Sequence, residues 1–238
     1  MRGVDSTYML EGIDISENIA VTPPQRSQYS IPDQAIVLAT ASSDLDKTLS
    51  DDFCEMLITV LRANPNAIYL AVGEGELTAQ KRKFESAGVG KRIGYTGKRR
   101  DLPAFLRIAD IYLAEFPAAS AQGVLGAMSV ERPVVAIRWG HDAAQSQAAT
   151  LVGTEYAITT RDTKTYIEKV NKLIRDAGAR AKAGRAMHDR VEQKFSLANT
   201  ARQLEQLCDQ LLVRKTAFAE AQSIIPAERQ VERLSQVA

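Results

Sequence analysis

Residues 117–136 read PAASAQGVLGAMSVERPVVA: small side chains, then an apolar run with helical spacing, then Arg-Pro and a second apolar run. This order predicts a tight turn, a helix over residues 121–130 and a buried strand over residues 133–139. Such a join suits an anionic ligand, because the first N–H groups of a helix are free and carry partial positive charge. The small residues would equally suit a turn that is only closely packed, so both interpretations stay open at this point.

The same alternation continues on both sides of this stretch. Short apolar runs predict further strands at residues 35–41, 67–72, 92–96, 111–116 and 156–159. Helical spacing appears between the runs, at residues 51–63, 77–87, 102–108 and 143–152, with Asp101 as a possible helix cap. Strands that alternate with helices form parallel sheets through right-handed crossovers. We therefore expect an α/β fold: a doubly wound, Rossmann-like parallel sheet of about six strands with C-terminal helices.

The ends of the chain have a different pattern from its centre. Three prolines among residues 22–32 indicate an irregular segment. After Asp162 the spacing is purely helical, which predicts helices at residues 166–175, 179–195 and 197–212. The resulting division is a lead-in or linker (residues 1–33), a Rossmann-like lobe (34–212) and a helical tail (213–238).

Composition excludes several classes of function. The 30 basic and 29 acidic side chains leave a net charge of +1, so no overall field favours nucleic acid or an anionic membrane. Cys54 and Cys208 lie in amphipathic patterns that predict buried thiols, and His141 and His188 lie too far apart to form a metal-binding motif. The absence of a metal-binding motif leads us to expect no metal. Because no long apolar run or signal peptide is present, we expect no membrane span and a cytoplasmic location.

Ligands of doubly wound sheets bind beyond the carboxyl ends of the strands. The loops expected there are residues 42–49, 73–76, 97–101, 117–122 and 140–142. Gly73 and Gly75 allow a sharp turn, but Thr78 occupies the place of the third glycine of a dinucleotide-binding fingerprint, so a nicotinamide cofactor has little support. No Ser/His/Asp set or pair of carboxylates with catalytic spacing is visible, so the catalytic residues stay unknown.

Charged residues follow several of the predicted strands. Lys47 comes after the first strand, and the run 98–100 (Lys-Arg-Arg) comes after the third, where each could screen a diphosphate or simply be solvated. Arg138 and His141 flank the loop after the fifth strand. Glu115 lies near the end of the fourth, and because a charge is rarely buried without a partner, we expect it to face the cleft or to end the strand.

Three segments together resemble a known family. The segments VGEGEL (72–77), RIGYTGKRRDLPAFLRIADIYLAEFP (92–117) and GVLGAMSVERPVVAI (123–137) resemble the C-terminal half of GT-B glycosyltransferases. Residues 40–70, TASSDLDKTLSDDFCEMLITVLRANPNAIYL, look closest to the O-linked GlcNAc transferase branch, in which a lysine follows the first strand of this lobe. The resemblance covers roughly residues 12–212, and the order and spacing of the motifs are more specific than any one motif.

The resemblance implies a lobe that holds the nucleotide diphosphate of a sugar donor. Carried over by position, the lysine would approach the diphosphate, the small-residue turn would cradle it, and the end of the third strand would lie near the base. The donor-binding residues implied in this way are Lys47, Gly73, Gly75, Gly97, Lys98, Arg99, Ser120, Gln122 and Gly123. The implied function is transfer of a hexosyl or GlcNAc-type sugar to a hydroxyl acceptor, with a nucleotide sugar, UDP-sugar favoured, as co-substrate and no other cofactor.

The sequence also departs from the pattern of this family. Many GT-B enzymes have an acidic residue at the position of Gly126, which binds the donor ribose, and commonly have glycine at the position of Glu131. The O-GlcNAc branch has two threonines at the positions of Gln122 and Gly123 and a histidine near Leu102. A charge-assisted hydrogen bond contributes about 1.5–3 kcal/mol, so loss of the ribose carboxylate predicts weaker donor binding.

The length of the chain leaves room for one lobe, since domains typically have about 100–150 residues. A GT-B enzyme needs a second lobe for its acceptor, so the resemblance implies an acceptor lobe or partner chain, and enzymatic activity is uncertain without it. The alternative is a non-catalytic glycosyltransferase-like domain that acts through protein–protein contacts. A two-lobed sugar-phosphate epimerase is a third hypothesis, but no catalytic carboxylate or histidine set can be placed for it.

Overall fold

The computed structural model of the chain describes residues 12–140 and 142–223. His141, one of the residues considered above, lies outside them. The described residues form two compact units. The larger unit comprises residues 13–196 and contains the sheet, and the other comprises Gly12 and helix α10 (Leu197–Ser223).

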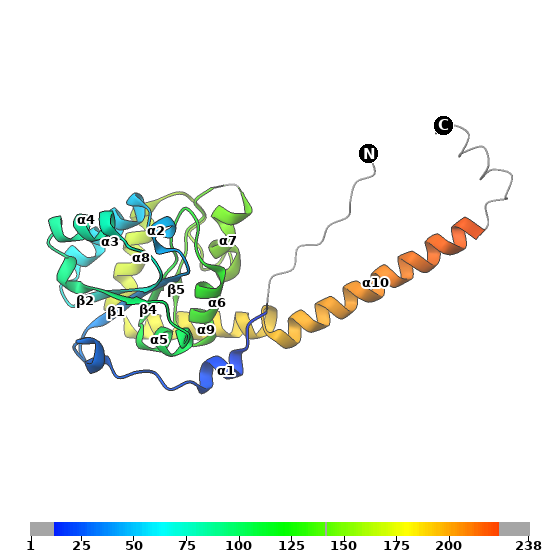
Figure 1. Ribbon diagram of the computed structural model, residues 1–238, viewed down its shortest axis with the longest axis horizontal. Helices are drawn as coiled ribbons and strands as arrows, with labels where there is room; N and C mark the ends of the chain where they lie inside the picture. The colour runs from blue at the N-terminus through cyan, green and yellow to red at the C-terminus, as the bar shows by residue number, and fades with distance from the viewer. Residues whose placement is uncertain (1–11, 141, 224–238) are drawn as a thin grey trace. The chain divides into compact units, whose positions relative to one another are not determined.

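Within the described residues, five parallel strands form one sheet in the order β3-β2-β1-β4-β5 (Figure 1). The strands are β1 (Ile36–Ser42), β2 (Ala67–Gly73), β3 (Ile93–Gly97), β4 (Ile111–Leu113) and β5 (Val134–Val135). From the central β1 the chain proceeds outward to β3, then returns and adds β4 and β5 on the other side. This order confirms the predicted doubly wound α/β fold and places its switch point between β1 and β4.

The predicted sixth strand, residues 156–159, is a single bridge between Ile137 and Ile158. The Ile158 N–H donates to the carbonyl of Ala136 at 2.9 Å, so one rung of pairing does form. The preceding residues, Tyr156 and Ala157, donate their N–H groups to the carbonyl of Gly153, which keeps the chain in a turn. The segment 156–159 therefore forms no regular strand, because turn hydrogen bonds to Gly153 occupy the N–H groups of its first two residues.

Helices cover both faces of the sheet. The helices are α1 (Ile15–Ala20), α2 (Leu45–Thr48), α3 (Asp51–Ala63), α4 (Thr78–Ser86), α5 (Leu102–Ile108), α6 (Ala121–Ser129), α7 (Ala143–Val152), α8 (Thr163–Arg175) and α9 (Ala177–Lys194), with 3-10 helices η1 (Arg26–Tyr29) and η2 (Gly90–Arg92). Helices α3, α4 and α8 pack into one large apolar cluster through Phe53, Phe84 and Val170. On the other face Phe105 and Ile108 of α5 pack against the sheet.

Helix α3 shows how local sequence sets these elements. Its apolar residues recur at helical spacing and are buried from Phe53 to Leu61. The Ser50 hydroxyl caps its first turn by accepting the N–H of Phe53 at 3.2 Å. The helix ends at Ala63, because Pro65 disfavours helical backbone at Asn64, the residue before it.

Part of the segment before the sheet is folded onto the larger unit. In α1, the Asn18 side chain donates to the hydroxyl of Ser129 in α6 at 2.9 Å. In η1, the Arg26 guanidinium pairs with Asp110 at 3.0 Å and also donates to the Ala35 carbonyl. These buried and half-buried bonds tie residues on both sides of position 33 to the same core.

The two thiols lie in different environments. Cys54 is buried in α3, as predicted, whereas Cys208 is exposed, which corrects the prediction for it. Nearly all described side chains of α10 around Cys208 are exposed, so the amphipathic pattern of this helix does not make a core there. Among residues 12–140 and 142–223, no helix is apolar and long enough to span a membrane, and no group of three metal-ligating side chains occurs.

Candidate functional site

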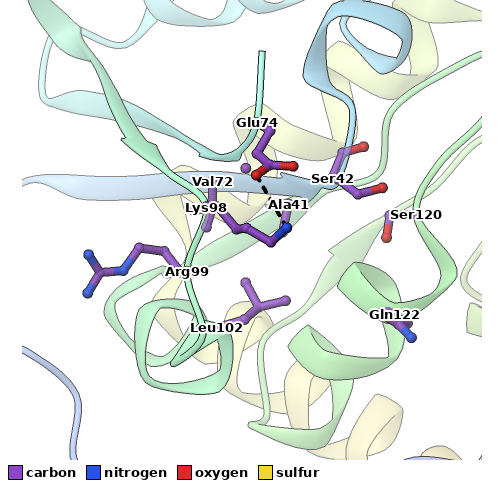
Figure 2. Close-up of a pocket in the computed structure, with 11 residues that line it drawn as sticks. Ala41, Ser42, Val72, Glu74, Lys98, Arg99, Leu102, Ser120 and Gln122 are labelled. Carbon is purple, nitrogen blue, oxygen red and sulfur yellow. Dashed lines mark ion pairs between the residues drawn. The ribbon is translucent and has the colours of Figure 1, made fainter.

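A cavity of about 210 Å³ opens at the carboxyl edge of the sheet, beside the switch point (Figure 2). The loops after β1, β2, β3 and β4 meet there, as the sequence predicts for this fold. The lining residues are Ala41, Ser42, Ser43, Val72, Gly73, Glu74, Lys98, Arg99, Leu102, Ser120 and Gln122. Five of the nine residues that the resemblance assigned to a donor site are therefore together, namely Gly73, Lys98, Arg99, Ser120 and Gln122.

The glycine loop after β2 is shaped by close backbone packing. Gly73 has φ +142°, and a Cβ atom there would lie 1.7 Å from the carbonyl oxygen of Ser42. The next turn is held by the Asp46 carboxylate, which accepts the N–H groups of Glu76 and Leu77 at 3.0 and 2.8 Å. Gly73 thus allows the ends of β1 and β2 to approach each other, and Gly75 does not line the cavity.

The N-terminus of α6 forms another wall. The Ser120 hydroxyl caps the helix by accepting the N–H of Gly123 at 3.2 Å. Gly123 itself is buried, and a Cβ atom there would lie 2.2 Å from the Tyr112 hydroxyl and 2.6 Å from the Ala41 carbonyl oxygen. Gly123 therefore lets the positive end of α6 approach the ends of β1 and β4 closely, and it contributes no lining atom.

Glu115 follows β4 and lies in the core. Its side chain is only 2% exposed, and neither carboxyl oxygen has a hydrogen-bond partner among the described residues. Glu115 was expected to face the cleft or to end the strand; it does follow the last residue of β4, but it is buried without a partner, so the premise that a charge is not buried there alone is wrong. Burial raises the pKa of Glu115 to about 8. The backbone N–H groups of Glu115 and Ser120 oppose this rise, but neither meets an oxygen with the geometry of a hydrogen bond.

The open side of the cavity carries charged residues that are already paired. The Lys98 ammonium lies 3.3 Å from the Glu74 carboxylate, and both side chains are more than half exposed (Figure 2). The Arg99 guanidinium binds the Asp101 carboxylate through two bonds of 3.0 Å and points away from Ser120. Asp101 was predicted to cap α5, but its carboxylate makes no cap bond because Arg99 engages it.

The structure does not bring two further predicted residues to the cavity. The Lys47 side chain is 84% exposed, and its ammonium pairs with the Asp44 carboxylate at 2.6 Å. This contact raises the pKa of Lys47 and lowers that of Asp44, mainly through the hydrogen bond between them. Gly97 has φ +67° and turns the chain after β3 without lining the cavity.

The departures from the family pattern now have positions in space. Gly126 is buried, and a Cβ atom there would lie 2.9 Å from a methyl group of Leu106, so this position faces α5. Glu131 has φ +60°, a left-handed conformation that glycine adopts far more readily. The sequence did not single out Ser42, Ser43 or Glu74, although their places at strand ends were visible.

Comparison with known proteins supplies the family context. The family model for glycosyl transferases group 1 matches residues 36–176. A search of curated protein sequences found no match.

Several solved structures share the fold of this chain. Anabaena Alr3699/HepE, solved with UDP and glucose, has a TM-score of 0.67 at 19% identity over 84% of this chain and 55% of HepE. The C-terminal domain of the group 1 glycosyl transferase LpcC from Francisella tularensis has a TM-score of 0.60 at 22% identity, over 78% of this chain and 100% of that domain. An O-GlcNAc transferase from Thermobaculum terrenum has a TM-score of 0.63 at 21% identity, over 80% of this chain and 38% of that protein. This chain thus spans about half the length of HepE and corresponds to the whole of the isolated LpcC domain.

Proposed function

Because this chain belongs to the glycosyl transferases group 1 family and has the fold of a GT-B C-terminal lobe, we propose that it is the donor-binding lobe of a glycosyltransferase. Such a lobe would hold a nucleotide sugar while the sugar passes to a hydroxyl acceptor. The observation that carries this proposal is the cavity beside the switch point, where the N-terminus of α6 meets the Ser42 and Ser120 hydroxyls and the Lys98 ammonium.

These groups suit a diphosphate. The first N–H groups of α6 and the positive end of its dipole attract phosphate oxygens. Lys98 adds a cation at the same side of the cavity, and a diphosphate would compete with Glu74 for it. As the bond to the sugar breaks, charge accumulates on the leaving diphosphate, and the same donors would stabilise that charge without a metal ion. Lys47 would have to leave Asp44 before it could take part.

We favour UDP as the nucleotide because HepE, a structural neighbour, was solved with UDP and with UDP-glucose. The cavity of about 210 Å³ is smaller than the roughly 300–1,000 Å³ typical of ligand pockets. Because this chain covers only 55% of HepE, we propose that a second lobe, which would bind the acceptor, closes the site. The free thiols of Cys54 and Cys208 suit the cytoplasmic location that we propose.

A melting experiment with millimolar UDP, GDP and ADP tests donor binding. A ligand that binds only the folded state stabilises it by about 2.7 kcal/mol at a hundredfold excess over its Kd, so a working site gives a clear shift. Lys98→Ala should reduce the shift, and Lys47→Ala tests whether the exposed lysine contributes. A shift that only Lys47→Ala reduces would overturn our assignment of Lys98.

The missing carboxylate at Gly126 and the Glu74 carboxylate beside Lys98 favour the second candidate, a non-catalytic domain that acts through protein contacts. No shift with any of the three nucleotides would support that candidate and contradict donor binding.

A further inference from the structure

Glu115 is a buried residue in the segment that leads from β4 to the cavity-lining Ser120. Among the residues that the structure describes, it is the only Asp, Glu, Lys or Arg in the core. It follows β4 and precedes Ser120, which lines the cavity and caps α6. The proposed function uses the end of α6 but gives no role to this carboxyl group.

The groups around Glu115 cannot satisfy a carboxylate. Three buried tyrosines lie close enough to sense its charge: Tyr69 from β2, Tyr112 from β4 and Tyr166 from α8. The Tyr166 hydroxyl is bonded to the carbonyls of Ala114 and Val135 at 3.0 and 2.9 Å. Burial places the pKa values of all three phenols well above 10, so they stay neutral while Glu115 titrates.

The hydroxyls of Tyr112 and Tyr69 also donate no hydrogen bond to the Glu115 carboxyl. The Tyr112 hydroxyl exchanges hydrogen bonds with the N–H and carbonyl of Ala41 at 3.1 and 3.2 Å, so its proton is used by β1. The Tyr69 hydroxyl and both Glu115 oxygens have no hydrogen-bond partner among the described residues. Cys54 of α3 lies near Tyr69, and burial raises its pKa to about 12, so it stays a neutral thiol.

The positive end of α6 is the group that links Glu115 to the cavity. The backbone N–H of Ser120 faces the Glu115 carboxyl, and the Ser120 side chain faces the cavity. An ionised Glu115 would therefore place a negative charge, in a medium of low dielectric, beside the same helix end that an anionic ligand needs. A neutral carboxyl leaves that end available.

We propose that Glu115 is a proton-holding positioning residue of the donor site, whose neutral carboxyl permits a nucleoside diphosphate to bind at α6 and whose ionisation weakens that binding. The inference rests on the proposed function. Linkage is reciprocal, so a bound diphosphate makes Glu115 hold its proton more tightly, and binding near the Glu115 pKa takes up protons from solution. That pKa of about 8 brings the change within an accessible range of pH.

Calorimetric titration with UDP between pH 7 and 9.5 tests the proposal. A phosphate loses its second proton near pH 6, so the charge of UDP is nearly constant in this range. For the wild type we expect Kd to rise roughly tenfold across the range, within the span of typical coupling between sites. For Glu115→Gln, which is neutral at every pH, we expect a lower and nearly constant Kd above pH 8. Glu131→Gln, an exposed glutamate at the other end of α6, is the matched control and should follow the wild type.

A second measurement needs only the wild-type protein. At pH 8, titrations in buffers of different ionisation enthalpy report protons taken up on binding, and we expect uptake. Equal pH dependence in wild type and Glu115→Gln, or no proton uptake in the wild type, would overturn this inference but leave donor binding intact. Failure of UDP to bind either protein at any pH would overturn donor binding and the inference together.

Discussion

Two groups of residues at the cavity differ in how closely they are packed and in whether their charges are paired. The floor is our name for Gly73, which lines the cavity, together with Glu115 and Gly123, which are buried and do not line it. A Cβ atom on either glycine would lie less than 3 Å from backbone oxygen, and the Glu115 carboxyl has no partner among the described residues. The rim, defined as Glu74, Lys98, Arg99 and Asp101, is exposed or half-exposed, and its charges form ion pairs.

The two glutamates of these regions show what the difference teaches. Glu74 and Lys98 are both exposed to solvent, and exposed ion pairs contribute only about 0–1 kcal/mol to stability. Glu115 has the same side chain without water or a cation, so its environment favours the neutral acid. We therefore expect substitutions in the floor to change the stability of the protein, whereas the charges of the rim can exchange their partners for a ligand.

Gly73→Ala should have the largest effect, because it fills the floor. The added Cβ would lie 1.7 Å from the Ser42 carbonyl oxygen at a φ of +142°, so two strand ends must separate. We expect a loss of about 3 kcal/mol or more in the free energy of unfolding, measured by urea denaturation. Gly97→Ala is the control: its φ is +67°, but the new Cβ meets no described atom within 4 Å, so about 1–2 kcal/mol should be lost. Equal losses would show that the close packing of Gly73 against Ser42 does not set the size of the effect.

Glu115→Gln should make the folded protein more stable at neutral pH. The folded pKa of about 8 lies above the ordinary 4.5, so the stability linked to this shift is fully present below pH 4.5 and is lost as pH rises from there through 8. At pH 7 the variant should gain on the order of 3 kcal/mol over the wild type, at about 1.36 kcal/mol per pH unit. Denaturation at pH 5 and pH 8 measures the gain. A difference that does not grow with pH would show that Glu115 is not held neutral.

Glu74→Gln should act on binding and leave stability nearly unchanged. The substitution frees Lys98 from an exposed pair, so the Kd for UDP should fall about three- to fivefold, equivalent to about 1 kcal/mol or less. Glu55→Gln is the matched control, since the exposed Glu55 also pairs with a lysine, the half-buried Lys83 at 3.1 Å, but lies on α3 and does not line the cavity. A tighter Kd in both variants would assign the effect to net charge rather than to the rim.

Glu131→Gly should have the smallest effect and belongs to neither region. Its left-handed backbone at φ +60° costs a side chain about 1 kcal/mol, part of which the greater unfolded-state freedom of glycine offsets. We expect a gain of about 0.5 kcal/mol in the free energy of unfolding and an unchanged Kd for UDP. A change in that Kd would mean that the far end of α6 influences the cavity.

Much of the fold followed from local patterns. The bounds predicted for α3, α5 and α7 agree with the structure, because the helical spacing of apolar residues is a local property of each segment. The meeting of the strand-end loops followed from the parallel topology alone. The predicted strand at residues 156–159 failed because turn bonds within the same stretch took the donors of the ladder.

The site was harder to predict, because its residues are defined by neighbours far along the chain. Gly123 looked like part of a ligand cradle, but its contacts are Tyr112 and the Ala41 carbonyl. Lys47 looked like the first cation of the site, but Asp44 holds its ammonium outside the cavity lining. Whether either residue contacts a ligand stays a prediction.

By itself, the amino-acid sequence determined the alternation of strands and helices, the parallel sheet and the edge at which its loops converge, because these depend on spacing and on chain connectivity. Only the tertiary structure decided which charged groups at that edge are exposed to solvent and which are buried. The reason is physical: the state of a carboxyl such as Glu115 depends on how much water and how many donors surround it, and those surroundings come from β2, β4 and α8, which are distant in sequence.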